Sequence, residues 1–177
     1  MQFVSAWRSG DCRILLDLGP RSLEVFSAHV QSSISTPEAG GLLLGTVHGQ
    51  GMLISEATTP TRLDRQWRTL FERMPFGHRA VAKLRWRASN GTVRYLGEWH
   101  THPEDYPHPS GTDVMEWRAL AVKRTDGRPV LAVIVGRKGL HVELMAASGE
   151  RIQLLPIFSD WAGKFDSNTA IANLGSS

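Results

Sequence analysis

Four residues of the 15-residue stretch from Trp99 to Asp113 have types and a spacing that could carry out chemistry: His100, His102, Ser110 and Asp113. His100 and His102 are separated by one residue, Ser110 follows eight positions after His102, and Asp113 follows three positions after Ser110. Imidazole nitrogens and carboxylate oxygens are ligands of Zn²⁺, and a catalytic zinc site combines three such ligands with an open position for water. The pattern therefore predicts that His100, His102 and Asp113 hold a catalytic zinc ion.

The complete spacing H-x-H-x7-S-x2-D is more specific than any of its parts. A chain of this composition would contain it by chance about 10⁻³ times, whereas a lone H-x-H is a weak signal. Taken singly, His100 is typical of a hydrogen-bonded core histidine, and His102 and His108 are typical of surface residues. Ser110 and Asp113 also resemble a capping box before an apolar helix. Capping and catalysis are compatible, because a helix N-terminus can hold both side chains in place.

Hydrolysis at such a site needs two further groups. Zinc lowers the pKa of a bound water from about 15.7 toward about 7, which makes hydroxide available at neutral pH. A general base must take a proton and return it to the leaving group, and glutamate is the expected type. A hydrogen-bond donor must also face the oxyanion, and the hydroxyl of Ser110 is placed to serve as that donor.

The elements around the motif explain its spacing. Residues 93–100 are expected to form a strand that runs into the motif, and alternate side chains of a strand share a face, so His100 and His102 point the same way. The proline-rich loop PEDYPHP cannot be helical. A helix is expected over 112–123. Its apolar stripe is predicted to consist of Met115, Ala119 and Val122, widened by Val114, Trp117 and Ala121.

The rest of the chain alternates short strands with two further helices. The apolar and turn patterns predict strands over 13–18, 38–47, 52–56, 130–135, 140–146 and 151–155, and helices from Pro20 to about Gln31 and over about 76–89. The last three strands form an antiparallel meander. Glycines 40, 41 and 45 are expected to leave room for close backbone approach.

Residues 58–94 carry nine Lys or Arg and only two acidic residues. Arg79, Lys83 and Arg87 fall on one face of the expected helix there, and Ala80, Leu84 and Ala88 line a neighbouring face. A solvated basic face is the simplest interpretation. A docking surface for an acidic protein partner is the alternative. Nucleic-acid binding is less favoured, because no recognised nucleic-acid motif accompanies the charge.

Length and composition predict a single domain over 1–177, with a core at about 12–157 and a tail at 159–177 that can be mobile. The chain is 41% hydrophobic and 21% charged, with a net charge of +3. No apolar run is long enough to cross a membrane. Cys12 is the one cysteine, which excludes an intrachain disulfide and favours a reducing, cytoplasmic location. We expect Cys12 to be a small core residue.

The four-point pattern resembles that of the JAMM (MPN+, Mov34/PAD-1) metalloprotease family, whose signature is an upstream Glu followed by H-x-H-x7-S-x2-D. The match is His100-Thr101-His102-Pro103, then Ser110 and Asp113. The order of the expected strands and helices also agrees, over about 12–157.

The resemblance implies a role for each matching residue. The family glutamate lies at the head of a glycine-rich strand after the first helix, which corresponds to Glu38 in PEAGGLLLG. By this likeness Glu38 is the base, Ser110 stabilises the oxyanion, and the two histidines and Asp113 bind zinc. Glu56 and Glu98 are alternative candidates for the base.

The resemblance also implies an α/β (α+β) fold, with a curved, mostly antiparallel sheet flanked by helices in a cytidine-deaminase-like architecture. The implied activity is hydrolysis of the amide bond after the C-terminus of a ubiquitin-like modifier or a similarly conjugated protein. The motif region is similar to bacterial JAMM proteins found with E1/E2-like enzymes, including the deconjugating protease of CBASS anti-phage operons, which acts on a conjugated CD-NTase. Processing of a sulfur-carrier protein and a non-catalytic scaffold are the alternatives.

Overall fold

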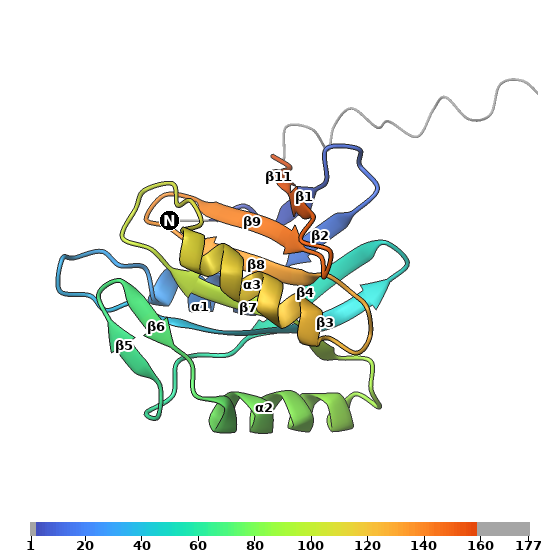
Figure 1. The fold of residues 1–177 in the computed structure, drawn as a ribbon, viewed down its shortest axis with the longest axis horizontal. Coiled ribbons are helices and arrows are strands. Elements are labelled where there is room, and N and C mark those ends of the chain that lie inside the picture. The colour runs from blue at the N-terminus through green and yellow to red at the C-terminus, as the bar shows by residue number, and fades with distance from the viewer. Residues whose placement is uncertain (1–2, 159–177) are drawn as a thin grey trace, which may run out of the picture.

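The computed structural model describes residues 3–158, which form one nine-stranded sheet, a separate two-stranded hairpin and three helices (Figure 1). The strand order in the large sheet is β10-β9-β8-β7-β3-β4-β2-β1-β11. The predicted tail at 159–177 lies outside the described residues. The strands are β1 (Ala6–Arg8), β2 (Leu15–Leu18), β3 (Gly40–His48), β4 (Gly51–Ala57), β5 (Arg65–Trp67), β6 (Leu70–Glu72), β7 (Arg94–Thr101), β8 (Val130–Val135), β9 (Leu140–Met145), β10 (Arg151–Gln153) and β11 (Leu155–Pro156), and the helices are α1 (Pro20–Ala28), α2 (Pro75–Ala88) and α3 (Gly111–Lys123).

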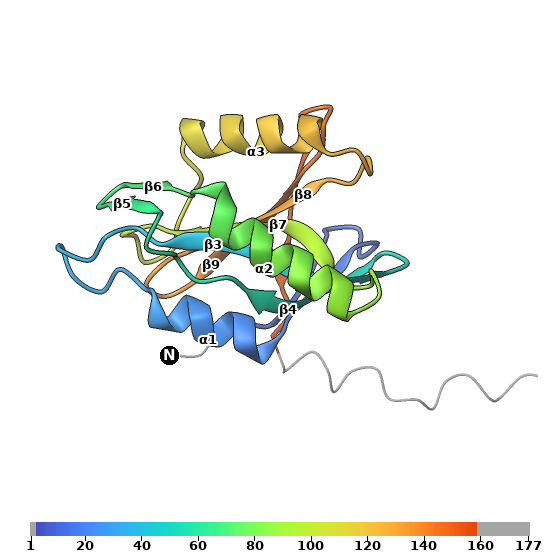
Figure 2. The ribbon, with the colours of Figure 1, turned by 90° about the horizontal axis from the view of Figure 1, so that it is seen from below.

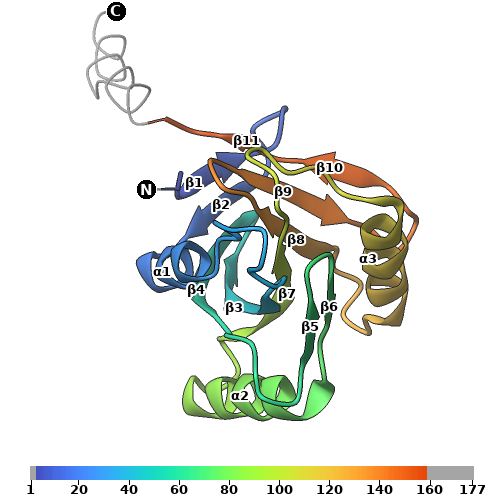
Figure 3. The same cartoon turned by 90° about the vertical axis from the view of Figure 1, so that its left-hand side faces the viewer.

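The large sheet is strongly curved. Its two outermost strands, β10 and β11, are separated in the chain by Leu154 alone, so the sheet must curl until its edges approach each other (Figure 3). The pairs β7–β8 and β2–β4 are parallel, and all other pairs in this sheet are antiparallel. The predicted fold class, a curved and mostly antiparallel sheet flanked by helices, is therefore confirmed.

Helices α1 and α3 cover opposite faces of the sheet (Figure 2). Phe26 of α1 packs on Trp99 of β7, with ring centroids 5.2 Å apart. Trp117 and Ala121 of α3 pack over β8 and β9 in a second apolar cluster. Side chains alternate along a strand, so Trp99 on the α1 face directs its neighbour His100 toward α3. This alternation turns His100 of β7, and His102 just after the strand, to the α3 side of the sheet.

Two of the predicted helices differ from those in the structure. Helix α1 ends at Ala28, so Gln31 lies beyond it. Helix α3 does not bury the predicted stripe. Met115 and Val122 are 67% and 62% exposed, whereas Trp117 is buried. Apolar residues lie on both sides of α3. Strands β8 and β9 pack against the side that carries the large indole ring of Trp117.

The prediction that Cys12 is a core residue is wrong. Its side chain is exposed, and its backbone has a positive φ of 59°. The cause is strand β1, which was not predicted. Because β1 pairs with β2, the residues between them form a surface turn.

Gly40, Gly41 and Gly45 allow the close approach that was predicted for them. A Cβ atom at Gly41 would lie 2.2 Å from the carbonyl oxygen of Thr58, and one at Gly45 would lie 1.9 Å from that of Leu53. At Gly40 a Cβ atom would meet the ring of Phe71 at 2.5 Å. Phe71 belongs to the β5–β6 hairpin, which was not predicted within 58–94. Glycine at position 40 therefore lets this hairpin pack against the start of β3.

Candidate metal centre

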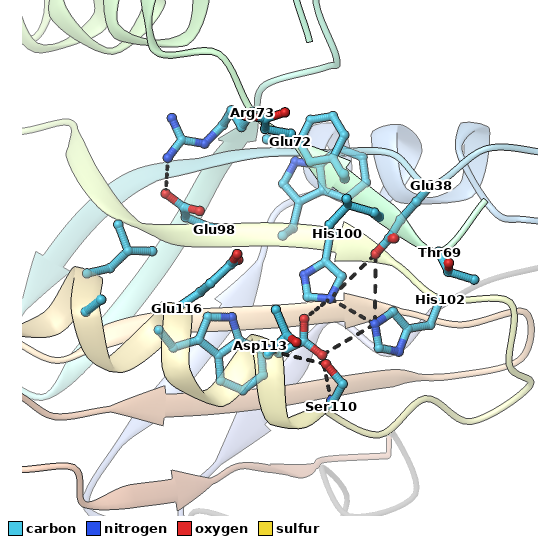
Figure 4. A pocket seen from close by; sticks show the side chains of 18 of the residues that line it. Glu38, Thr69, Glu72, Arg73, Glu98, His100, His102, Ser110, Asp113 and Glu116 are labelled. Carbon is cyan, nitrogen blue, oxygen red and sulfur yellow. Dashed lines mark hydrogen bonds and ion pairs between the residues drawn. The ribbon is translucent and has the colours of Figure 1, made fainter. Parts of the chain in front are cut away.

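Strand β7 and the first turn of α3 bring His100, His102 and Asp113 together (Figure 4). The Nε2 atoms of the two histidines are 3.1 Å apart. Asp113 lies 3.2 Å from His100 Nε2 through Oδ1 and 3.5 Å from His102 Nε2 through Oδ2. Two imidazole nitrogens and the two oxygens of one carboxylate, from segments eleven residues apart in the chain, thus lie close together.

These separations fit a shared zinc ion. Four ligands bound tetrahedrally at about 2.0–2.1 Å lie about 3.3 Å from one another. The three measured separations, 3.1, 3.2 and 3.5 Å, are close to this value. Two facing imidazole nitrogens can form only one hydrogen bond between them when both rings are neutral. A shared cation would satisfy both nitrogens.

Glu38 stands next to this set, at the entrance to β3. Its Oε1 atom is 3.9 Å from the Nε2 atoms of both His100 and His102. Glu38, His100 and His102 could by themselves also hold a metal ion. Asp113 lies closer to both histidines than Glu38 does, so Asp113 would be the third ligand of a metal ion held there and Glu38 would lie next to that ion.

The pKa of Glu38 is raised to about 7. Burial is the largest cause, since the side chain is almost entirely enclosed; the negative charges of Asp113 and Glu116 also raise the pKa, while His100 opposes the shift. A general base works best when its pKa is near the working pH. In the metal-free site, burial thus brings the pKa of Glu38 toward neutral pH, and a bound cation would act in the opposite direction by favouring the carboxylate.

Ser110 caps helix α3. Its Oγ atom accepts a hydrogen bond from the backbone N–H of Asp113 at 3.2 Å, and the Asp113 carboxylate accepts one from the backbone N–H of Ser110 at 2.6 Å. The predicted capping box is thus present. Ser110 Oγ can accept this hydrogen bond and still donate its own proton, for which the Asp113 carboxylate is one acceptor within reach. Ser110 can therefore cap the helix and donate to an oxyanion at the same time.

The pKa of Asp113 is lowered below its usual range. Burial alone would raise it, but the hydrogen bond and positive charge of His100 and the hydrogen bonds from Ser110 outweigh the burial. The carboxylate is consequently ionised in the form that a metal ligand requires.

A buried hydrogen-bond network holds the backbone beside Glu38. The hydroxyl of Thr101, the residue between the two histidines, accepts from the backbone N–H of Ala39 at 3.0 Å and donates to Gln31 Oε1 at 3.1 Å. The backbone N–H of Thr101 donates to Ala39 O at 2.8 Å. Glu38 and the histidine strand are thereby joined across β3 and β7.

The same network reaches the β5–β6 hairpin. The Nε2 atom of Gln31 donates to Thr36 O at 3.1 Å and to Arg68 O, at the tip of the hairpin, at 2.8 Å. The backbone N–H of Glu38 donates to Trp67 O at 2.7 Å. The side-chain amide of Gln31 therefore uses both donors and its acceptor, and it links the hairpin to the segment that carries Glu38.

The buried side chain of Trp117 packs helix α3 against the sheet. The centroid of this indole is 6.4 Å from the ring centroids of both His100 and His141. His141 contacts the buried carboxylate of Glu143 at 2.8 Å, and Arg151 pairs with that carboxylate. This packing fixes the distance between α3, which carries Ser110 and Asp113, and the sheet.

A groove of about 570 Å³ contains the site and runs between α3 and β6. Acidic side chains line much of it, and Arg73 pairs with Glu98 along its wall (Figure 4). The acidic residues of the lining are Glu38, Glu72, Glu98, Glu104, Asp113 and Glu116.

Glu56 and Glu98, the alternative candidates for the base, are less well placed than Glu38. Glu56 on β4 forms an ion pair with Arg85 and is not among the groove residues. Glu98 lines the groove, but Arg73 and the hydroxyl of Tyr95 contact its carboxylate. Of the three candidate glutamates, Glu38 is the one that faces both histidines.

Sequence analysis missed Gln31, Thr101 and the hairpin. A signal for Thr101 was present: in a strand it must point away from the histidines, into the apolar core, where a hydroxyl requires a partner. Nothing local identified Gln31 as that partner, because the two residues are 70 positions apart.

Comparison with known proteins shows the family to which the chain belongs. Residues 20–148 match the family model described as prokaryotic homologs of the JAB domain, and this range includes Glu38, Ser110 and the three potential ligands. The chain belongs to the prokaryotic JAB family. It is a JAMM-type hydrolase, as the sequence resemblance predicted.

Similar JAB proteins carry one name. A Pseudomonas aeruginosa protein is 58% identical over 89% of this chain and 99% of its own length, and an Escherichia coli protein is 37% identical over 66% of this chain and 72% of its own. Both are named CD-NTase/cGAS isopeptidase. A solution structure of a Desulfitobacterium hafniense protein has the same fold, with a TM-score of 0.56 and 20% identity over 81% of this chain and 91% of its own.

Within residues 3–158, no helix is both long and apolar enough to cross a lipid bilayer.

Proposed function

We propose that this JAB protein is a zinc-dependent isopeptidase, which cleaves the amide bond between the C-terminus of a conjugated protein and a target amine. The observation that carries the proposal is the convergence of His100, His102 and Asp113 within 3.1–3.5 Å of one another, with Glu38 at 3.9 Å. A structural zinc site normally has four protein ligands, whereas this one would have three and a neighbouring base.

The chain's own residues would divide the chemistry among them. A zinc ion held by the two histidines and Asp113 supplies Lewis acidity that lowers the pKa of water. As the oxygen of the attacking water bonds to the carbonyl carbon, Glu38 accepts a proton from that water. Ser110 donates a hydrogen bond to the carbonyl oxygen as negative charge develops there. When the C–N bond breaks, Glu38 returns the proton to the leaving nitrogen, so the products are a carboxylic acid and an amine.

The groove supports a substrate with an extended tail. Strand β6 pairs with β5 and with no other strand of the described chain, and residues 70–72 line the groove. The backbone groups of a strand edge can pair with an extended peptide. An unfolded C-terminal tail is the part of a conjugated protein that could enter this groove.

The names of the relatives support a CD-NTase as the conjugated protein. The Pseudomonas aeruginosa relative matches over almost its whole length and is named for this substrate. An E1/E2-like enzyme would form the conjugate that this protein removes. The exposed free thiol of Cys12 is compatible with the reducing cytoplasm, where we place the reaction.

The test is replacement of the base with its neutral isostere. Glu38→Gln should lower kcat by about 10²–10⁴ while one zinc per chain is retained, because Glu38 acts on protons and is not a ligand. Cleavage of a CD-NTase–lysine conjugate and metal content by mass spectrometry provide the two readouts. Glu24→Gln, at an exposed position of α1, is the matched control. Loss of zinc together with activity would instead make Glu38 a ligand, and full activity would overturn its role.

A further inference from the structure

Helix α2 exposes an unusual combination of side chains. Phe76, Leu84 and Trp86 are 77%, 58% and 52% exposed. With 3.6 residues per turn, these three fall on the same broad face as three exposed cations. The set is called the α2 surface here and consists of Phe76, Arg79, Lys83, Leu84, Trp86 and Arg87.

The inner face of α2 is already occupied. His78 is completely buried and contacts Thr58 and Asp64 through its two ring nitrogens, and Arg85 pairs with Glu56. The α2 surface points the other way. Within the described chain, Arg79, Lys83 and Arg87 have neither an ion pair nor a side-chain hydrogen bond. The three cations of the α2 surface therefore have no ionic or hydrogen-bonded partner among the described residues.

Charge is unevenly divided between this region and the rest of the protein. Nine of the 20 Lys and Arg and two of the 17 acidic residues lie in 58–94, so this segment carries +7 and the remainder carries −4. Inside the segment, Asp64 is buried with His78, and Glu72 pairs with Arg65. The positive charge of the protein is concentrated beside an acidic groove, and it attracts a partner whose facing surface is acidic.

The mixture of residue types favours a protein over a nucleic acid. Aromatic residues and arginine are enriched in protein–protein interfaces, and exposed large apolar side chains gain from burial there. Phosphate backbones are bound by cations. They offer no apolar surface to Leu84, which stands among the cations of α2.

Helix α2 follows directly after the strand that lines the groove, although none of the groove-lining residues belongs to α2 itself. Strand β6 ends at Glu72, and helix α2 begins at Pro75, three residues later. Arg73 between them lines the groove wall. Figures 1 and 2 show α2 beside the β5–β6 hairpin in both views. A folded domain whose tail enters the groove along β6 would therefore meet α2 next.

We propose that the α2 surface binds an acidic face of the folded protein substrate whose C-terminal tail occupies the groove. This inference rests on the isopeptidase activity proposed above and names the surface that recognises the body of the substrate. The groove binds the tail, and α2 selects the domain to which the tail belongs.

The experiment compares two substrates that share one scissile bond. The first is a folded CD-NTase joined through its C-terminal carboxyl group to the ε-amine of a labelled lysine peptide, and the second carries only the last few residues of that CD-NTase. The charge-reversed variant is Arg79→Glu/Lys83→Glu/Arg87→Glu. We expect KM for the folded conjugate to rise about tenfold or more, with kcat unchanged and with both constants unchanged for the short conjugate.

Two further variants isolate the cause. Phe76→Ser/Leu84→Ser should raise KM for the folded conjugate without any change of charge. Arg21→Glu/Arg118→Glu/Arg128→Glu makes the same change of net charge at exposed positions outside α2, and it should leave KM unchanged. All substituted side chains are exposed, so the variants should fold, and circular dichroism melting curves check this.

Several outcomes would overturn the proposal. They are an unchanged KM for the folded conjugate, an equal rise for both conjugates, or an equal effect of the control variant. A short duplex DNA or RNA that binds wild type but not the charge-reversed variant, with KM unaffected, would assign α2 to nucleic acid. If wild type cleaves neither substrate, the proposed activity fails. The docking proposal is then decided by fluorescence anisotropy of labelled CD-NTase, whose binding must be present in wild type and lost in the charge-reversed variant.

Discussion

Two clusters of histidine and aspartate, His78 with Asp64 and His100 and His102 with Asp113, differ in how fully their polar atoms are satisfied. His78 is sealed in the interior, with Nδ1 2.7 Å from Thr58 Oγ1 and Nε2 2.9 Å from Asp64 Oδ2. Asp64 also accepts hydrogen bonds from the backbone N–H groups of Thr61 at 2.6 Å and Met74 at 2.7 Å.

At the metal centre the same residue types are arranged in the opposite way. The Nε2 atoms of His100 and His102 face each other, and both side chains keep about 15% of their surface exposed at the groove. A sealed and satisfied cluster stabilises the fold, because its polar atoms already have partners. A cluster whose ligand atoms converge on a shared point beside a groove is arranged to bind an additional atom.

The largest effect on zinc binding and cleavage is expected when one of the two facing histidines of the metal site is removed. His100→Ala should abolish zinc binding and reduce cleavage to the uncatalysed rate, because two remaining protein ligands do not hold a catalytic zinc ion. Zinc content and single-turnover cleavage are the measurements. His108→Ala, at an exposed position in the loop after β7, serves as the control. A His100→Ala protein with full zinc and activity would contradict the assignment of the site.

Removing the hydroxyl of Ser110 tests the smaller contribution of the oxyanion donor. Ser110→Ala should lower kcat by about 10²–10³ and destabilise the protein by about 1 kcal/mol through loss of the helix cap. Ser110→Asp restores a capping oxygen but not a donor, so it should recover stability without recovering kcat. Recovery of both would show that Ser110 acts through the cap alone.

The hydrogen-bond network around Gln31 is expected to have an intermediate effect on catalysis. Gln31→Glu keeps an acceptor for Thr101 but removes the donors to Thr36 O and Arg68 O. We expect kcat to fall about tenfold with zinc content unchanged, because Glu38 loses the hairpin that helps to position it. Faster hydrogen exchange at residues 65–72 should accompany the loss. Unchanged exchange with reduced kcat would exclude positioning by the hairpin.

The sealed cluster should show the smallest effect on chemistry and a clear effect on stability. His78→Ala should destabilise the protein by about 3 kcal/mol, because Thr58 and Asp64 lose a buried partner, while kcat per folded molecule and zinc content stay near wild type. Urea unfolding and active-site titration measure the two quantities. If His78→Ala lost zinc but kept its stability, the His78 cluster would no longer differ from the metal site in what it does.

The sealed cluster also predicts a pH dependence. Burial alone would raise the pKa of Asp64, but hydrogen bonds from Thr61, His78 and Met74 outweigh the burial and lower the pKa. A lowered folded-state pKa contributes stability that is complete above the unfolded value, about 3.9, and is lost as pH falls through the folded value. Asp64→Asn should therefore flatten the acid limb of the stability curve, measured by urea unfolding at several pH values.

The sequence and the structure agree best where the geometry is local. The histidine pair follows from strand alternation, and the proximity of Ser110 to Asp113 follows from the capping box at the start of α3. They agree least where a helix has apolar residues on two sides. Met115 and Val122 of α3 are exposed because β8 and β9 pack against Trp117 instead.

The sequence by itself identified the family and predicted the potential ligands and most of the larger strands and helices, because each depends on residue types at short, regular spacings. Only the tertiary structure decided how the site is completed. Glu38 reaches the histidines because β3 pairs antiparallel to β7, with Gly40 opposite His100. Gln31, the hairpin and the exposed face of α2 likewise depend on contacts between distant segments. Such contacts are set by packing of the whole sheet, which no local pattern encodes.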